Sequence, residues 1–250
     1  MVCRDRWVDL AMKRLVIPSL LLAALASWAA NPHLAVVARK NVAAGGFDKT
    51  GLVAWWDFDN ANDSHDAGPY NLTETGGAPT YTNGYGVGVS ASSKYWINAS
   101  VGSVVNTGTN ADHTIVMRWR VKSSYVSNRT AFHSLGGRGL VRKGDAGTSG
   151  VWNYRVNNIF KTGSTNPNGA WMLSIFGWNA STQEVEVYED NGSLQNGTGT
   201  PNWGNAEARF CDTAGTDVDI DFAAGFSRLL TAGERTTLYN GGATITYGDL

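Results

Sequence analysis

Apolar and polar residues alternate along much of the chain after residue 51, and this alternation predicts short β-strands. In TIVMRWRVK (114–122) the apolar positions are Ile115, Met117, Trp119 and Val121, and the charged positions between them are Arg118, Arg120 and Lys122. In DVDIDF (217–222) the apolar Val218, Ile220 and Phe222 alternate with Asp217, Asp219 and Asp221. Because successive side chains of a strand point to opposite faces, each stretch predicts a strand with one buried and one solvent-exposed face.

Other stretches extend this strand pattern. LVAWWDF (52–58) is apolar at odd and even positions alike, which predicts a strand covered on both faces. Further strands are predicted at VWNYRV (151–156), WMLSIFGW (171–178) and EVEVYE (184–189), and Asp190-Asn191-Gly192 after the last is a tight-turn signal. Short strands separated by Gly- and Asn-rich turns, with no long helix and no sequence repeat, indicate an all-β fold, a β-sandwich.

The end of the chain departs from the strand pattern. Thr231-Ala-Gly-Glu234 matches a capping box, in which the Thr hydroxyl accepts a hydrogen bond from the Glu N–H and the Glu carboxylate accepts one from the Thr N–H. Asn240-Gly241 supplies residues that tolerate the left-handed conformation that ends many helices. We therefore predict a short helix over 232–239 that covers an edge of the core.

Composition limits the class of protein. A chain of 250 residues that is 42% hydrophobic, with 30 Gly and 10 Trp, fits one large all-β domain. The formal net charge of −1 leaves no excess of positive charge to neutralise phosphates, so nucleic acid is not expected as a partner. Cys3 and Cys211 define no disulfide framework, and Cys211 is interpreted as a small buried apolar residue.

Residues 1–30 are interpreted as an N-terminal hydrophobic export or attachment segment. Met12-Lys13-Arg14 precedes an uncharged apolar run, and Ser27 and Ala29 suit a signal-peptidase cleavage site, which favours a signal peptide that starts at Met12. The run is shorter than the about 20 residues that cross a bilayer, so no membrane span is expected in the mature chain. The alternative is a retained helix that packs against a larger assembly. Residues 31–50 are interpreted as a linker and residues 51–250 as the domain.

The closing stretch GFSRLLTAGERTTLYNGG resembles the final motif of laminin G-like jelly-roll domains in the concanavalin A-like lectin and glucanase superfamily. Other stretches follow in the order of that family, and they are GLVAWWDFDNANDSHDAGPYN (51–71), TIVMRWRVKS, GLVRKGD (139–145) and EVEVYEDNGSL (184–194). The resemblance covers roughly residues 51–250. It implies a jelly roll, a β-sandwich of two antiparallel sheets with one short C-terminal helix.

The resemblance also implies a class of function. Members of the family are mostly noncatalytic binding or adhesion modules for glycans or proteins, while glucanases of the superfamily carry Glu-x-Asp-x-x-Glu on one strand, with a nucleophile and a general acid. Glu184-Val-Glu186-Val-Tyr-Glu189 has this spacing but replaces the Asp by Glu. We interpret it as a solvated hairpin arm with Val185 and Val187 pointing inward. A glycoside hydrolase or lyase, which rests only on this strand, is the third candidate function.

Metal chemistry has one candidate. His33, His65, His113 and His133 lack the spacing of metal ligands. Carboxylates crowd one loop, where Asp57, Asp59 and Asp66 are candidate ligands of a calcium ion, as in some relatives. The alternative is that these Asp residues only stabilise turns, because Asp is a common turn residue.

Aromatic residues beside Gly-, Asn- and Thr-rich loops are candidates for stacking on the apolar faces of sugars. They are Tyr81, Tyr85, Tyr95, Trp96, Trp152, Tyr154 and Trp203, and from these we select Trp152, Tyr154 and Trp203 as the ligand-binding surface. Trp56, Trp119 and Trp171 fit the interior of strands instead.

Together these observations predict a noncatalytic carbohydrate-binding or adhesion module, secreted or displayed on a cell surface, whose partner is a glycan or cell-surface polysaccharide. The alternative is a phage virion structural protein, a tail or capsid-surface component with virion proteins as partners. It is favoured by the retained-helix interpretation of residues 12–41 and by the ending YNGGATITYGDL, which resembles those of phage-encoded relatives.

Overall fold

The structure is a computed structural model. It describes residues 47–62, 64, 68–76, 80–87, 95–101, 111–121, 130–134, 141–143, 151–156, 159–165, 169–190, 192, 195–198, 208–211 and 218–250. The chain divides into two units, Met1–Gly46 and Phe47–Leu250, and the description concerns the second. The predicted export or attachment segment and the start of the linker lie outside the described residues. Phe47 packs against Phe226, with ring centroids 5.9 Å apart, so the domain begins before residue 51.

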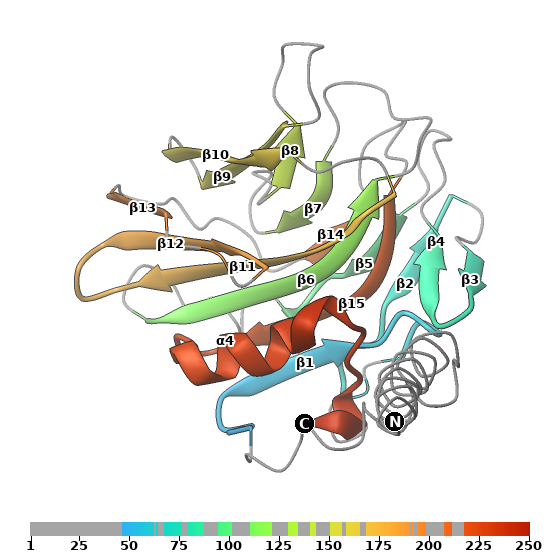
Figure 1. Cartoon of the computed structure of the whole chain (residues 1–250). Coiled ribbons are helices and arrows are strands. Elements are labelled where there is room, and N and C mark those ends of the chain that lie inside the picture. Colours follow the sequence, from blue (N-terminus) through green and yellow to red (C-terminus); the bar gives the residue numbers. More distant parts are fainter. Residues whose placement is uncertain are drawn as a thin grey trace, which may run out of the picture. The chain divides into compact units, whose positions relative to one another are not determined.

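The described part of the chain contains two antiparallel sheets (Figure 1). The eight-stranded sheet runs in the order β13 (Gln195–Thr198), β12 (Glu184–Glu189), β11 (Trp171–Asn179), β6 (His113–Val121), β15 (Val218–Phe226), β4 (Tyr85–Val87) and β3 (Thr80–Thr82), with β1 (Leu52–Trp56) paired to β15. The seven-stranded sheet runs in the order β10 (Ile159–Thr165), β9 (Val151–Val156), β8 (Val141–Lys143), β7 (Thr130–Ser134), β14 (Ala208–Phe210), β5 (Tyr95–Asn98) and β2 (Thr73–Thr75). The predicted all-β sandwich is confirmed.

The main core contains residues from both sheets. Trp56, Trp119 and Phe58 are at most 3% exposed, and the first two confirm the strand-interior prediction. Trp96, which sequence analysis placed beside a loop, is fully buried on β5, where its ring meets Phe58 edge-on at 5.1 Å. Its indole N–H donates to the Tyr81 hydroxyl at 2.9 Å, so the polar edge of this buried ring is satisfied.

A second apolar cluster lies on the opposite face of the eight-stranded sheet, called here the outer face. Trp55 stacks on Phe222 at 4.8 Å, and Leu238 of the C-terminal helix α4 (Ala232–Tyr239) belongs to the same cluster. Because this sheet packs on both faces, all five residues of β1 and all nine of β15 are buried. The predicted double-faced burial of the stretch at 52–58 is confirmed for β1.

The predicted solvent-exposed face of β6 and β15 is wrong. Arg118 is 5% exposed, and Asp219 and Asp221 are 2% and 3% exposed. Arg118 donates to Asp221, to the Gly242 carbonyl at 2.5 Å and to Thr244 Oγ1 at 3.1 Å. The C-terminal residues therefore cover this face, and the buried charges are tolerated because they are paired and hydrogen-bonded.

The predicted alternation of Val218, Ile220 and Phe222 is also wrong in part. Ile220 pairs with Trp119 and Phe222 with Arg118, so Asp221 is an extra residue in β15. Such a β-bulge reverses which face the following side chains point to. Val218 and Ile220 consequently lie in the main core, whereas Phe222 joins the outer-face cluster.

Helix α4 agrees with the prediction in its bounds and its caps. The Thr231 hydroxyl accepts from the Glu234 N–H, and the Glu234 carboxylate accepts from the Thr231 N–H at 2.7 Å. Asn240 ends the helix in the left-handed conformation with φ 44°. The chain then forms the short 3-10 turns η2 (Asn240–Gly242) and η3 (Tyr247–Asp249).

Candidate functional site

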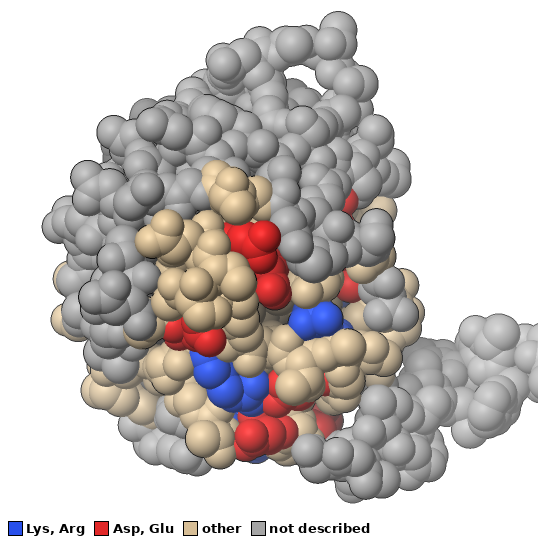
Figure 2. Space-filling view, turned by 90° about the vertical axis from the view of Figure 1, so that its left-hand side faces the viewer, with Lys and Arg blue, Asp and Glu red and all other residues tan. Residues whose placement is uncertain are grey.

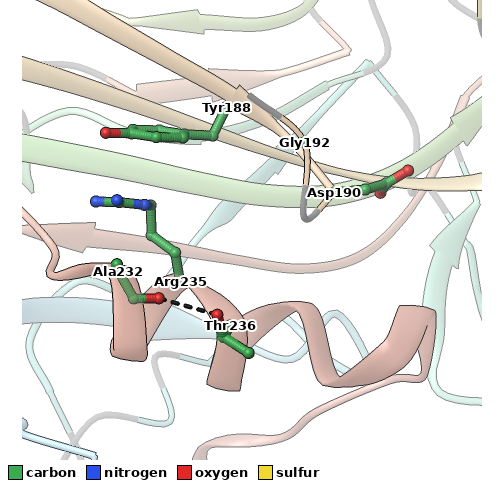
Figure 3. Close-up of a pocket in the computed structure, with 6 residues that line it drawn as sticks. All are labelled: Tyr188, Asp190, Gly192, Ala232, Arg235 and Thr236. Carbon is green, nitrogen blue, oxygen red and sulfur yellow. Dashed lines mark hydrogen bonds between the residues drawn. The ribbon is translucent and has the colours of Figure 1, made fainter. Parts of the chain in front are cut away.

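A pocket of about 180 Å³ opens on the outer face, between the end of β12 and the first half of α4 (Figure 3). Its lining residues are Tyr188, Asp190, Gly192, Ala232, Arg235 and Thr236. Two elements that are adjacent only in the tertiary structure therefore bring together an aromatic ring, a guanidinium, a carboxylate and a hydroxyl. These are the side-chain types that bind a small polar ligand.

Tyr188 and Arg235 form one wall of the pocket. The Arg235 guanidinium lies over the Tyr188 ring, 3.9 Å from its centroid, and Figure 3 shows the two groups facing each other. Arg235 also donates to the Leu230 carbonyl at 2.5 Å, and within the described residues it makes no ion pair. Burial and the nearby Glu186, which accepts from the Tyr188 hydroxyl at 3.2 Å, raise the pKa of Tyr188. The wall is thus cationic and preorganised.

Asp190 lies at the other end of the pocket in a fixed position. Its N–H donates to the Leu173 carbonyl at 2.8 Å, and its Oδ1 accepts from the Leu173 N–H at 2.8 Å. Its φ of 51° is in the left-handed region, which Asp tolerates better than most residues. Gly192 N–H donates to the Glu189 carbonyl at 2.8 Å, which confirms the predicted turn at these two residues. Burial raises the pKa of Asp190.

A second cluster on the outer face combines arginine with aromatic rings. The Arg120 guanidinium lies 4.6 Å from the Trp171 ring centroid and 4.8 Å from that of Tyr85. It is ion-paired with Asp219 at 2.8 Å. The prediction that Trp171 lies in the strand interior is therefore wrong. Trp171 is half-buried against cationic side chains, because its position in β11 is opposite Arg120.

The predicted ligand-binding aromatics are placed only in part. Trp152 and Tyr154 are on β9, where their backbones pair with Lys143 and Lys161. Their side chains, and the whole of Trp203, lie outside the described residues. Their role as a binding surface stays a prediction.

The predicted calcium ligands are also placed only in part. Asp57 Oδ1 accepts from the Trp55 indole N–H at 2.5 Å and from the Tyr247 N–H at 3.2 Å, and burial raises the pKa of this carboxyl. Asp59 accepts from the Asn60 amide at 2.7 Å, and Asp66 lies outside the described residues. No group of three or more His, Cys, Asp or Glu that would hold a metal ion occurs within the described ranges. The fit of Asp57 to a cation is poor, because one of its oxygens already accepts two hydrogen bonds.

The acidic strand β12 has the orientation expected of a hairpin arm. Val185 and Val187 are 1% and 2% exposed and lie in the main core, as predicted. Glu184 and Glu186, which alternate with them, are half-buried. The same alternation directs Tyr188 toward the pocket.

Sequence reasoning missed Tyr188, Asp190 and Arg235 as a group. The strand alternation could have indicated Tyr188, because it points to the face opposite that of its neighbour Val187. The helical spacing could have indicated Arg235, because it lies three residues before the buried Leu238. These periods place both side chains on faces that turn toward a neighbour. The neighbour itself was not predictable from either period.

Side chains of both signs occur on the surface of the described residues. Figure 2 shows lysine and arginine beside aspartate and glutamate on the face that it displays, and neither sign forms a continuous patch over the described residues. Within the same residues, no helix is long and apolar enough to cross a membrane.

No family model matches the sequence, and no curated protein matches it. Among solved structures, a Trypanosoma rangeli sialidase is similar with 11% identity and a TM-score of 0.57, over 76% of this chain and 32% of that chain. The binding domain of Paraclostridial Mosquitocidal Protein 1 is similar with 16% identity and a TM-score of 0.57, over 77% of this chain and 52% of that chain. A botulinum neurotoxin type C structure is similar with 12% identity and a TM-score of 0.57, over 76% of this chain and 51% of that chain.

The described part of the chain is a β-sandwich, and its fold is similar to the matched parts of these proteins. At such low identity the likeness shows the fold alone, and folds of this kind host many functions. The chain spans about a third of the sialidase (32%) and about half of the two toxin structures (52% and 51%).

Proposed function

We propose that the chain is a noncatalytic carbohydrate-binding or adhesion module. The observation that carries this proposal is the pocket between β12 and α4, where Tyr188, Arg235 and Asp190 surround a space open to a ligand. Sugar hydroxyls are bound by charged and polar side chains, and the lining of this pocket contains such groups.

The similar structures support this choice of ligand class. The Trypanosoma rangeli sialidase has been solved with sialic acid, and cell entry of botulinum neurotoxin type C depends on interaction with two ganglioside molecules. A botulinum neurotoxin binding domain has also been solved in complex with SialylT. These complexes support the proposal that this chain is a glycan-binding β-sandwich. The laminin G-like sequence motifs are consistent with the same proposal.

A blocking substitution at the pocket tests the proposal. Thr236 and Thr237 are neighbours on α4, and their hydroxyls donate to the carbonyls of Ala232 and Gly233 at 3.0 and 3.1 Å. Thr236 lines the pocket, whereas Thr237 is not among its lining residues. On a glycan array, we expect the full chain to bind a set of glycans, Thr236→Trp to lose this binding and the matched control Thr237→Trp to keep it. Failure of the unmodified chain to bind any glycan would contradict the function.

A phage virion component remains the second candidate, favoured by the apolar and basic stretch at 12–41. In that case the jelly roll would recognise the host surface and the retained segment would attach to virion proteins. The intact mass of the protein from its native source separates the candidates. A chain that begins near Ala30 supports a secreted or surface protein, and a chain that keeps residues 12–30 supports the virion.

A further inference from the structure

Four adjacent strands of the eight-stranded sheet bring an arginine and two aromatic rings together on the outer face. Arg120 of β6 is opposite Trp171 of β11 on one side and opposite Asp219 of β15 on the other. Tyr85 is on β4, the next strand, where the adjacent Gly86 faces the main core. Successive residues of a strand point to opposite faces, so Tyr85 points to the outer face.

Tyr85, Trp171 and Arg120, called here the aromatic platform, contact one another. The two ring centroids are 5.5 Å apart with an interplanar angle of 73°, and the guanidinium lies within 4.8 Å of both centroids. All three side chains are half-buried, whereas Trp55 and Phe222 of the outer-face cluster are fully buried. Packing of the domain therefore leaves part of the platform open to solvent.

The guanidinium of the platform has donors that the ion pair does not use. Its Nε donates to Asp219 Oδ2 at 2.9 Å, and its Nη2 lies 2.8 Å from the same oxygen. A guanidinium carries five N–H groups, and those of Arg120 Nη1 have no acceptor among the described residues. The Arg120 side chain is 27% exposed and that of Asp219 only 3%, so the donors are on the solvent side of the pair.

These donors favour one kind of ligand. An anion would compete with the Asp219 carboxylate for the guanidinium, whereas a neutral hydroxyl accepts from an N–H that the carboxylate leaves unused. A purely apolar ligand would cover Nη1 and deprive its N–H groups of water, which costs free energy. The ligand that fits therefore combines an apolar surface for the rings with hydroxyls for the guanidinium.

We propose that the aromatic platform is a second sugar contact of this domain. One neutral sugar ring places its C–H groups on Tyr85 and Trp171, and one of its hydroxyls accepts from Nη1 of Arg120. The three side chains by themselves are far smaller than the about 800 Å² that each partner of a stable protein complex buries, which favours a sugar over a protein. Sequence analysis selected Tyr85 for stacking on sugars, and the pocket between β12 and α4 does not use it.

The inference rests on the proposed function, because it adds a contact to a glycan-binding domain. Two contacts on one domain act together only where glycans are dense, as in a polysaccharide or on a crowded surface. The platform should therefore strengthen binding to densely displayed glycans and contribute little when single glycans are far apart.

Two substitutions weaken the platform without leaving a buried charge unpaired. Tyr85→Ala removes one ring, and Arg120→Lys keeps a cation beside Asp219 but removes the Nη1 donors. We expect each to weaken binding to dense glycans about three- to tenfold, as for one lost aromatic contact or hydrogen bond. Tyr239→Ala is the matched control, because Tyr239 is also a half-buried tyrosine of the outer-face cluster but belongs neither to the platform nor to the pocket lining.

The experiment compares the full chain, these three variants and Thr236→Trp on glycan arrays printed at high and at low density. The arrays carry lactose, cellotetraose and maltotetraose as neutral glycans and sialyllactose as an acidic one. Circular dichroism with thermal unfolding verifies that each variant remains folded. Serial dilution of the protein gives an apparent Kd for each glycan at each density.

The expected result is weaker binding of Tyr85→Ala and Arg120→Lys to a neutral glycan at high density only, with Tyr239→Ala like the unmodified chain. Equal weakening at both densities would show that the substitutions act through the fold or the pocket, and it would overturn the inference. Unchanged binding of both variants, with binding lost in Thr236→Trp, would also overturn it and leave the proposed function standing. If the unmodified chain binds no glycan, the proposed function fails and the inference fails with it.

Discussion

His113, at the start of β6, is a side chain whose charge is controlled by burial. It is fully buried, and its Nδ1 lies 3.3 Å from the Ala111 carbonyl oxygen. Burial lowers the pKa of His113 to about 4, because an imidazolium loses its hydration inside the fold. The folded protein therefore holds this ring neutral at pH values where the unfolded chain protonates it.

A pH dependence of stability follows. The ordinary pKa of 6.5 applies to the unfolded chain and the value of about 4 to the folded one, so the stability is complete above pH 6.5 and falls as the pH drops toward 4. The loss attributable to this residue is about 3 kcal/mol at most. Urea unfolding at several pH values should show it in the unmodified chain. The variant His113→Gln should lack this part of the slope, and an identical slope in the two proteins would contradict the assignment.

Gly86 on β4 is a residue where size alone matters. A methyl group at this position would lie 2.7 Å from Phe58 Cδ1 and 3.0 Å from two Trp96 ring atoms. Both rings are fully buried, so they have little room to move. We expect Gly86→Ala to lower the free energy of unfolding by about 1–3 kcal/mol, measured by urea denaturation. Unchanged stability would show that the sheets separate locally at little cost.

At the scale of elements, α4 shows how local and tertiary interactions combine. Its start is stabilised by the capping box, and Arg228 forms an ion pair with Glu234 in the first turn. Burial opposes ionisation of Glu234, but hydrogen bonds from Arg228 and Thr231 outweigh it and lower the pKa of this carboxyl. The helix has eight residues, which is too short for stability in isolation, so the buried Leu238 is needed to attach it to the sheet.

Gly233 in α4 offers a test of the helix itself. It is exposed, it has no positive φ, and a methyl group added there would meet its nearest atom at 4.0 Å. Gly233→Ala should therefore raise the free energy of unfolding by about 0.5–1 kcal/mol, because Ala loses less backbone entropy in a helix. The sign is opposite to that expected for Gly86→Ala, and thermal denaturation of both variants compares them directly. A loss of stability in Gly233→Ala would mean that the helix start is not as described.

At the scale of the molecule, the second unit is a sandwich with an additional layer. The C-terminal residues cover the outer face, and Arg118 joins β6, β15 and the η2 region through Asp221, Gly242 and Thr244. Lys49, near the start of the unit, lies 3.9 Å from the centroid of the Tyr247 ring, so the two ends of the unit meet. The pocket exists because this third layer stands beside the sheet.

Removal of the Arg118 charge tests the whole arrangement. Arg118→Gln leaves the Asp221 carboxylate buried without its ion-pair partner, so we expect a loss of about 3–5 kcal/mol in the free energy of unfolding. The control Lys49→Gln removes a cation near the surface and should cost less than about 1 kcal/mol. Equal effects of the two substitutions in urea denaturation would show that Arg118 does not hold the third layer.

Features that depend on neighbours in the chain could be predicted from the amino-acid sequence. These were the strand parity that buries Val185 and Val187, the capping box and bounds of α4, the turn at Asp190 and Gly192, and the all-β class. Each arises from steric and hydrogen-bonding preferences over a few residues. Three features became visible only in the folded domain: charged Arg118 and Asp221 are buried, a bulge reverses the direction of Phe222, and Tyr188 and Arg235 share a pocket. These features require contacts between residues far apart in the chain. An alternating pattern predicts that a strand has a polar face, but it does not predict which other part of the chain covers that face.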